Sequence, residues 1–271
     1  MCGYCEDLKK VIKRKRELEN IENPTNLDNE QYIELQKYEF AIQSHKNNNN
    51  KQRKAFFESI EKLENNEAIL LMDFKENIKL GGSQREVNRI YYSKSQRTIL
   101  CIIVITNKGR QYFDFVSEDL CHDAEFVEQS IIELISSPEF VQYNIKQVHF
   151  WSDGGKHFRN GQLQNFYKDL FLKKVFSLVT FNYFIEYHEK SYCDSHFSVI
   201  SKIIENYETG VDQIRNTSHL IFILKDNFLK ISTKKEKEII NIHFLNLNLL
   251  KERFISRKLK LKIRNYFTVS V

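Results

Sequence analysis

The sequence has little cysteine and glycine and no long apolar run. Its longest uninterrupted apolar stretch, ILCIIVI at residues 99–105, is much shorter than the roughly 18 residues that suggest a membrane span. The first residues, MCGYCEDLKK, contain no apolar core of a signal peptide. The five cysteines are an odd number, scattered at positions 2, 5, 101, 121 and 193, and do not form a disulfide framework. We therefore expect a soluble intracellular protein, in a reducing compartment, with no membrane partner.

Positive charge is concentrated toward both ends of the chain. The net charge is only +5, and 41% hydrophobic content is enough for one sizeable core. Six of the eight residues of Lys9–Arg16 are basic, as are seven of the 14 residues of Lys251–Arg264. Such clusters can sit on a polyanion, so we expect DNA as a partner. The first cluster also resembles a nuclear-import signal, which predicts a nuclear location.

Changes of pattern divide the chain into three parts. Residues 1–66 are charged and rich in Glu, Lys and Gln, which predicts helices with breaks around Pro24 and at Asn47–Asn50. Residues 67–210 alternate between apolar runs and amphipathic stretches. Residues 211–271 are a basic extension that we expect to be helical.

The middle part predicts strands and helices in the order β-β-β-α-β-α-β-α. Glycine-containing turns at LGGSQ and TNKGRQ separate three strand candidates, and IKQVHFWSD and VFSLVTFNYF are the fourth and fifth. This order is typical of an α/β protein in which an antiparallel meander joins βαβ crossovers. The first and fourth strands are expected to be neighbours at the centre of the sheet.

Three helices are expected between and after these strands. Asp123 can cap the first, and Pro138 stops it. In LQNFYKDLFLKK, apolar residues from Leu163 to Phe171 form one helical stripe. The last helix, DSHFSVISKIIENY, carries apolar residues along one side.

Three aspartates stand where chemistry is expected. Asp73 follows AILLM inside a strand, where aspartate is unfavourable and a buried carboxylate needs a partner. Asp153 ends the fourth strand, and Asp194 opens the last helix. If that helix folds back over the sheet, the three carboxylates converge. Oxygen-only ligands suit Mg²⁺ or Mn²⁺, and two such ions can serve phosphodiester chemistry.

Each aspartate also has a simpler structural interpretation. Asp194 could be a helix N-cap, and Asp153 could be a turn residue before two glycines. For Asp73 the simple interpretation requires a buried partner that the sequence does not identify. His149 is expected to be a packed strand residue, and Glu76 falls on the opposite strand face from Asp73.

The loops around these aspartates predict contacts with nucleic acid. In VHFWSDGGKHFRN, Gly154 and Gly155 remove side-chain bulk beside Asp153, so that a phosphate backbone could approach closely. The expected phosphate contacts come from three residues that follow: Lys156, His157 and Arg159. Before Asp194, the loop residues His188 and Lys190 could stabilise charge in a transition state, or could simply be solvated.

The N-terminal CGYC segment offers a second metal hypothesis. Cys2 and Cys5 have the spacing of half a zinc site, and the other ligands would come from distant residues such as His45. The alternative is a pair of free thiols.

The three segments LLMDFKENIKL, VHFWSDGGKHFRN and NYFIEYHEKSYCDSHFS together resemble the catalytic core of eukaryotic cut-and-paste DNA transposases, over residues 66–207. The resemblance implies a ribonuclease H-like fold and assigns its three acidic positions to Asp73, Asp153 and Asp194. Glu189 departs from the pattern, because the family usually has glycine there.

The resemblance implies metal-dependent DNA cleavage and strand transfer, in which water and then a DNA 3′-hydroxyl attack phosphodiester bonds. A homo-oligomer on DNA is a further expectation. No complete zinc-finger or helix-turn-helix module for binding transposon ends is recognisable. A domesticated copy that binds DNA without catalysis is therefore the alternative.

Overall fold

A six-stranded mixed sheet forms the body of the protein in the computed structural model, which describes residues 3–21, 24–81, 94–184, 192–210, 212–232 and 238–244. Its strands are β1 (Glu67–Lys79), β2 (Gln96–Thr106), β3 (Gly109–Ser117), β4 (Gln147–Ser152), β5 (Leu178–Tyr183) and β6 (Glu238–Phe244). The helices are α1 (Gly3–Glu19), α2 (Asn26–Glu61), α4 (Ala124–Ser136), α5 (Pro138–Val141), α6 (Gly161–Leu172), α7 (Tyr192–Gly210) and α8 (Thr217–Ser232). None of these helices is long and apolar enough to span a membrane.

The strands lie in the order β5-β4-β1-β2-β3-β6. The pairs β1–β2 and β2–β3 are antiparallel, whereas β4 is parallel to β1 and β5 is parallel to β4. This confirms the predicted meander joined to crossovers, with β1 and β4 adjacent. The α/β class and the order of the first five strands therefore follow the prediction.

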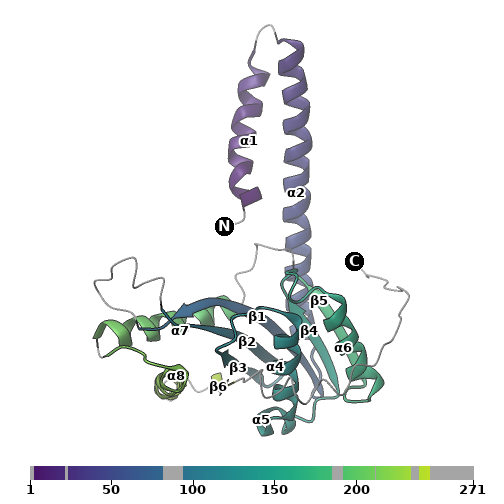
Figure 1. Ribbon diagram of the computed structural model, residues 1–271. Coiled ribbons are helices and arrows are strands. Elements are labelled where there is room, and N and C mark those ends of the chain that lie inside the picture. The colour runs from purple at the N-terminus through teal and green to yellow at the C-terminus, as the bar shows by residue number, and fades with distance from the viewer. Residues whose placement is uncertain are drawn as a thin grey trace.

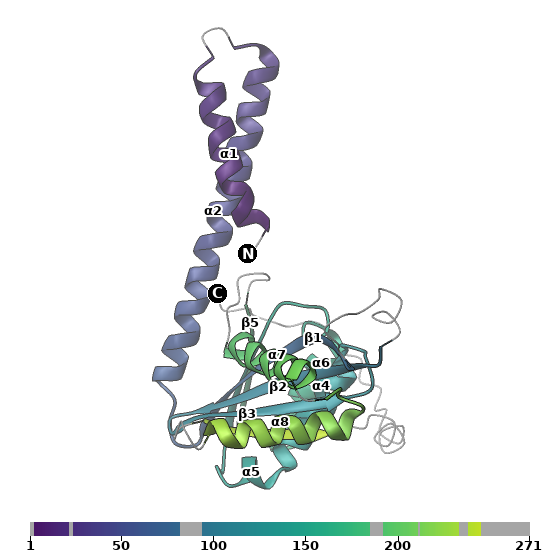
Figure 2. The ribbon, with the colours of Figure 1, turned by 90° about the vertical axis from the view of Figure 1, so that its left-hand side faces the viewer.

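Helices cover both faces of the sheet (Figures 1 and 2). On one face, α7 and α8 pack on a core that includes Leu71 and Ile103, and on the other, α4 and α6 pack on a core that includes Leu70 and Val104. The central strand β2 contributes to both cores, and its residues 97–106 are all buried. The apolar run ILCIIVI is therefore buried on both faces of the sheet.

The first two predicted crossover helices form as expected, with one exception. Asp123 caps α4 by accepting a hydrogen bond from the Phe126 N–H at 2.9 Å, and Pro138 begins the separate short helix α5. On α6, Leu163 and Leu170 are buried, but Phe171 is 49% exposed. The prediction for Phe171 is wrong because eight residues turn the helix about 80° away from Leu163, beyond the buried stripe.

The first two helices form a hairpin that projects from the sheet (Figure 1). A salt bridge of 2.6 Å between Lys15 and Glu39 joins them. Helix α2 runs without interruption through Asn47–Asn50, so the predicted loop there is wrong. Each asparagine costs up to about 0.7 kcal/mol in a helix relative to alanine. Buried residues such as Ile42 and Phe56 hold the helix on either side and offset this cost.

Aromatic packing attaches the end of α2 to the sheet. The Phe56 ring meets Trp151 of β4 and Phe184, which follows β5, edge-to-face at 5.1 and 5.2 Å between centroids. Tyr192, the first residue of α7, lies 6.5 Å from the same ring. The hairpin therefore joins the body next to the segments that carry Asp153 and Asp194.

The C-terminal part contributes a strand as well as a helix. Helix α8 agrees with the predicted helical extension and packs against the sheet. Residues 238–244 instead form β6, which pairs with β3 in parallel and extends the sheet, so a purely helical extension is wrong for this segment. Ile240 and Ile242 alternate with Asn241 and His243, which is a strand pattern. Lys251–Arg264 lie outside the described residues.

Candidate active site

The register of the sheet brings Asp73 and Asp153 together. Strands β1 and β4 are parallel, and Met72 pairs with Ser152 at the last residue of β4. The next residue in each segment is an aspartate, Asp73 within β1 and Asp153 just after β4, so the two lie side by side where β4 ends. Both side chains are half-buried. The predicted meeting of the first and fourth strands therefore forms one end of the candidate site.

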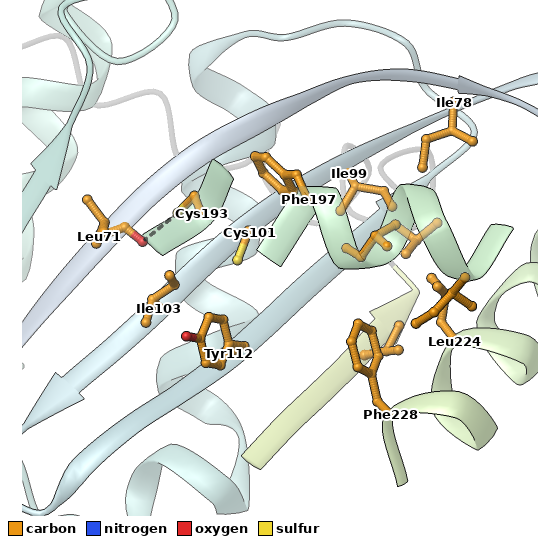
Figure 3. Packing of buried hydrophobic residues seen from close by; sticks show 14 of the residues in the cluster. Leu71, Ile78, Ile99, Cys101, Ile103, Tyr112, Cys193, Phe197, Leu224 and Phe228 are labelled. Carbon is orange, nitrogen blue, oxygen red and sulfur yellow. Dashed lines mark hydrogen bonds between the residues drawn. The ribbon is translucent and has the colours of Figure 1, made fainter. Parts of the chain in front are cut away.

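Helix α7 brings the third aspartate over β1. Near its start, the Cys193 thiol lies 4.0 Å from the backbone oxygen of Leu71 and donates to it (Figure 3). One turn later, the Nζ atom of Lys75 lies 5.7 Å from the centre of the Phe197 ring. Asp194 lies between these two contacts in the sequence. The helix thus runs over β1 with Asp194 near Asp73.

The N-cap interpretation of Asp194 is wrong. Helix α7 begins at Tyr192, so Asp194 is its third residue and lies within the first turn. A carboxylate there is favoured by the helix dipole, but it is not the capping residue.

The protonation of Asp73 reflects this gathering of carboxylates. Burial raises its pKa, and repulsion from Asp153 and Asp194 raises it further, to about 7. His157 opposes this effect only weakly. The charged groups with the largest effect on the Asp73 pKa are therefore two more carboxylates. A purely structural aspartate would instead need a buried partner that stabilises its charge.

Asp153 is held by the turn that follows it. Its Oδ1 accepts a hydrogen bond from the Gly155 N–H at 2.9 Å, and the Nε2 of His157 lies 3.5 Å from the same oxygen. Burial raises the pKa of Asp153, but the His157 imidazole and the Gly155 N–H outweigh it and lower the pKa below its usual value. Asp153 therefore stabilises the turn, and it also stays ionised, as a metal ligand must.

Gly155 is required by contacts within the protein. A Cβ atom at this position would lie 2.7 Å from Cε1 of His157 and 2.9 Å from Oδ1 of Asp153. Both distances are shorter than van der Waals contact allows. The missing side chain therefore lets the imidazole approach the carboxylate, which is a different reason from the predicted approach of a phosphate backbone.

The phosphate-binding residues that the sequence predicts have different surroundings. His157 is half-buried, with its ring centroid 5.2 Å from Phe74 and 4.5 Å from Phe158. Lys156 and Arg159 are exposed, and Gly154 is half-buried in the same turn. The side chains of Lys156 and Arg159 remain available for phosphates, whereas the His157 side chain lies against Asp153 and lowers its pKa.

Sequence reasoning missed the residues that hold His157 in place. Phe74 follows Asp73 on β1 and points to the opposite face, where His122 stacks on its ring at 4.4 Å. The Nε2 atom of His122 also lies 2.9 Å from Oδ1 of Asn77. Phe74 and Asn77 lie on β1, whereas His122 follows β3 and His157 follows β4, so no local pattern could have joined them.

The three aspartates are spread more widely than the ligands of a single ion. Among the described residues, the one group with three ligand atoms all within 4.8 Å of one another is Cys101, Asp114 and His196. A wider carboxylate set suits two divalent ions about 4 Å apart. Its oxygen donors suit Mg²⁺ or Mn²⁺.

Several predicted residues fall outside what the structure describes. His188 and Lys190 belong to residues 185–191, and Cys2 precedes the first described residue. Only the backbone of Cys5, in α1, is described, so zinc binding there stays a prediction. In the basic cluster Lys9–Arg16, Lys15 is bound to Glu39.

Comparison with known families gave one match. A family model described as a domain of unknown function (DUF8701) matches residues 52–265. Comparison with curated proteins gave no match. The matched range includes all three aspartates and every strand of the sheet.

Proposed function

The chain belongs to the DUF8701 family, whose description assigns no function, and we propose from its own residues that it is a divalent-metal-dependent DNA nuclease and strand transferase of the transposase type. The observation that carries this proposal is the gathering of Asp73, Asp153 and Asp194 from β1, the end of β4 and the first turn of α7.

The topology supports a ribonuclease H-like core. Strands β3, β2 and β1 form an antiparallel meander, and β4 and β5 continue the sheet in parallel with β1. The transposase resemblance implies this element order, with acidic residues on the first strand, after the fourth and following the fifth. Strand β6 is an addition on the outer side of β3.

The residues of the site have different proposed roles. Asp73, Asp153 and Asp194 would supply the oxygens that hold Mg²⁺ or Mn²⁺. Such ions would stabilise the negative charge on the attacking and leaving oxygens of a phosphodiester. His157 orients Asp153 and keeps it ionised.

The substrate side of the site is basic. The exposed side chains of Lys156 and Arg159 follow Asp153 and would contact phosphates on either side of the scissile bond. The positively charged helix α1, on the projecting hairpin, would bind DNA farther from the cleavage point. Both features favour DNA over a small phosphate ester.

A cleavage assay tests this proposal. Supercoiled plasmid and short DNA duplexes are incubated with the full chain in Mn²⁺, in Mg²⁺ and in chelator, and nicked and linear products are measured. We expect cleavage that requires a divalent ion and that falls by about 1,000-fold or more in Asp153→Asn, because the amide is a poor ligand.

Asp226→Asn is the matched control for this assay. Asp226 is a surface carboxylate on α8 with Lys230 as its partner, so its loss should leave cleavage unchanged. Equal cleavage by wild type and Asp153→Asn would contradict the proposal. The protein could also bind DNA yet give no products with any metal ion or DNA substrate tested. In that case a catalytically inactive DNA-binding protein becomes the better assignment.

A further inference from the structure

A row of polar residues crosses the buried face of the sheet beneath α7. Cys101 of β2 pairs with Asp73 of β1 on one side and with Asp114 of β3 on the other. Directly paired residues of an antiparallel sheet point to the same face. The row therefore continues from the candidate active site into the core.

Helix α7 contributes to the same place. The Nε2 atom of His196 lies 2.7 Å from Oδ2 of Asp114, and both residues are buried. Burial and the nearby Cys193 thiol raise the pKa of Cys101. Both cysteines are buried, and neither forms a disulfide. Figure 3 shows Cys101 on β2 beneath the start of α7, with Cys193 directed to the backbone oxygen of Leu71.

This cluster contains an unsatisfied acceptor in an apolar environment. The Oδ1 atom of Asp114 is buried without a hydrogen-bond partner, although the residue has 0% exposure. A buried polar atom without a hydrogen-bond partner is destabilising, and more so when it is charged. Aromatic rings of Tyr112 and Phe228 stack on His196 at 4.7 and 5.2 Å and exclude water from this side.

We propose that Cys101, Asp114 and His196 bind a structural zinc ion, with Cys193 turning from the Leu71 carbonyl to become the fourth ligand. The ligand atoms of the first three residues already lie within 4.8 Å of one another. Thiolate, imidazole and carboxylate donors are those of tetrahedral zinc sites, and sulfur ligands disfavour Mg²⁺. The ion would neutralise the Asp114 carboxylate and occupy the space that its free oxygen faces.

The zinc site would fix the position of the third catalytic carboxylate. Cys193 and His196 flank Asp194 in the first turn and a half of α7. A zinc ion that links Cys193 and His196 to β2 and β3 would fix the distance of the helix from β1 and its rotation about its own axis. The site is nevertheless separate from the aspartate cluster, since sulfur and nitrogen donors bind zinc without any contribution from Asp153.

Metal analysis of the purified full chain tests this inference. Zinc is measured by mass spectrometry after purification without chelators, and the protein is then reconstituted with Co²⁺. We expect one zinc per chain and the near-ultraviolet charge-transfer band that thiolate-bound Co²⁺ gives. Cys101→Ser should lower zinc affinity by about tenfold or more and weaken the band.

Three control variants separate the possible sites. Cys121→Ser removes an exposed cysteine and should keep the zinc. The double variant Cys2→Ser, Cys5→Ser should also keep it, and so should Asp153→Asn, whatever its cleavage activity. A wild-type chain with neither zinc nor a cobalt band would overturn the inference, as would zinc that survives Cys101→Ser and disappears in the double variant.

Discussion

Replacing Asp73 with asparagine is expected to stabilise the metal-free protein at pH 8 while abolishing cleavage. The Asp73 carboxyl is half-buried beside two other carboxylates, which raises its pKa to about 7. Ionising it in the folded state costs on the order of 4 kcal/mol relative to the unfolded chain. Asparagine removes this cost together with the ligand.

The pH dependence of this effect has a defined sign. Between about pH 4 and pH 7 the unfolded chain loses the Asp73 proton and the folded chain keeps it, so wild-type stability falls as pH rises. The difference between wild type and Asp73→Asn should therefore be near zero at pH 4 and largest above pH 7. Urea unfolding of both proteins in chelator at several pH values measures it.

Asp169→Asn is a suitable control, because Asp169 pairs with Lys173 on the surface of α6. Its stability difference from wild type should stay small at every pH. If the metal-free Asp73→Asn protein is less stable than wild type at pH 8, Asp73 has a cationic partner. Its role is then structural, and it is not a metal ligand.

Asp194→Asn is expected to lower cleavage by orders of magnitude with little change in stability. The substitution removes an anionic metal ligand, for which an amide is a poor replacement. Its effect on folding should be limited to about 0.3–1 kcal/mol, since the carboxylate also interacts favourably with the N-terminal end of α7. Cleavage rates and urea midpoints of the same preparation separate the two effects.

Glu205→Gln provides the matched variant on the same helix. Glu205 is exposed three turns farther along α7, beside Lys75 and Glu76. It should therefore retain nearly full activity. If Asp194→Asn cleaves DNA at the wild-type rate and Glu205→Gln does not, the third ligand is Glu205.

The element order and the two central aspartates could be predicted because their signals are local. Alternating apolar residues and glycine-containing turns define the meander, and parallel crossovers place β4 beside β1. An aspartate within an apolar strand indicates special surroundings wherever it occurs. The position of Asp194 within the first turn of α7 instead depends on where the helix begins, and the sequence does not determine this to within two residues.

Other parts of the site depend on contacts between distant segments. Asp114 lies in QYFDFV and is an aspartate in an apolar strand like Asp73, so the sequence does carry a signal for it. Its partner His196 lies 82 residues away and could not be identified without the fold. Likewise, the contact of Gly155 with His157 depends on the shape of the turn after β4.

The most direct measurement is Mn²⁺ binding to the full chain, counted from the free-ion signal in electron paramagnetic resonance. The proposed aspartate site predicts about two Mn²⁺ per wild-type chain. In Asp73→Asn this binding should be largely lost, and Asp226→Asn should bind like wild type. Equal Mn²⁺ binding by wild type and Asp73→Asn would contradict the assignment of Asp73, Asp153 and Asp194 as one divalent-metal site.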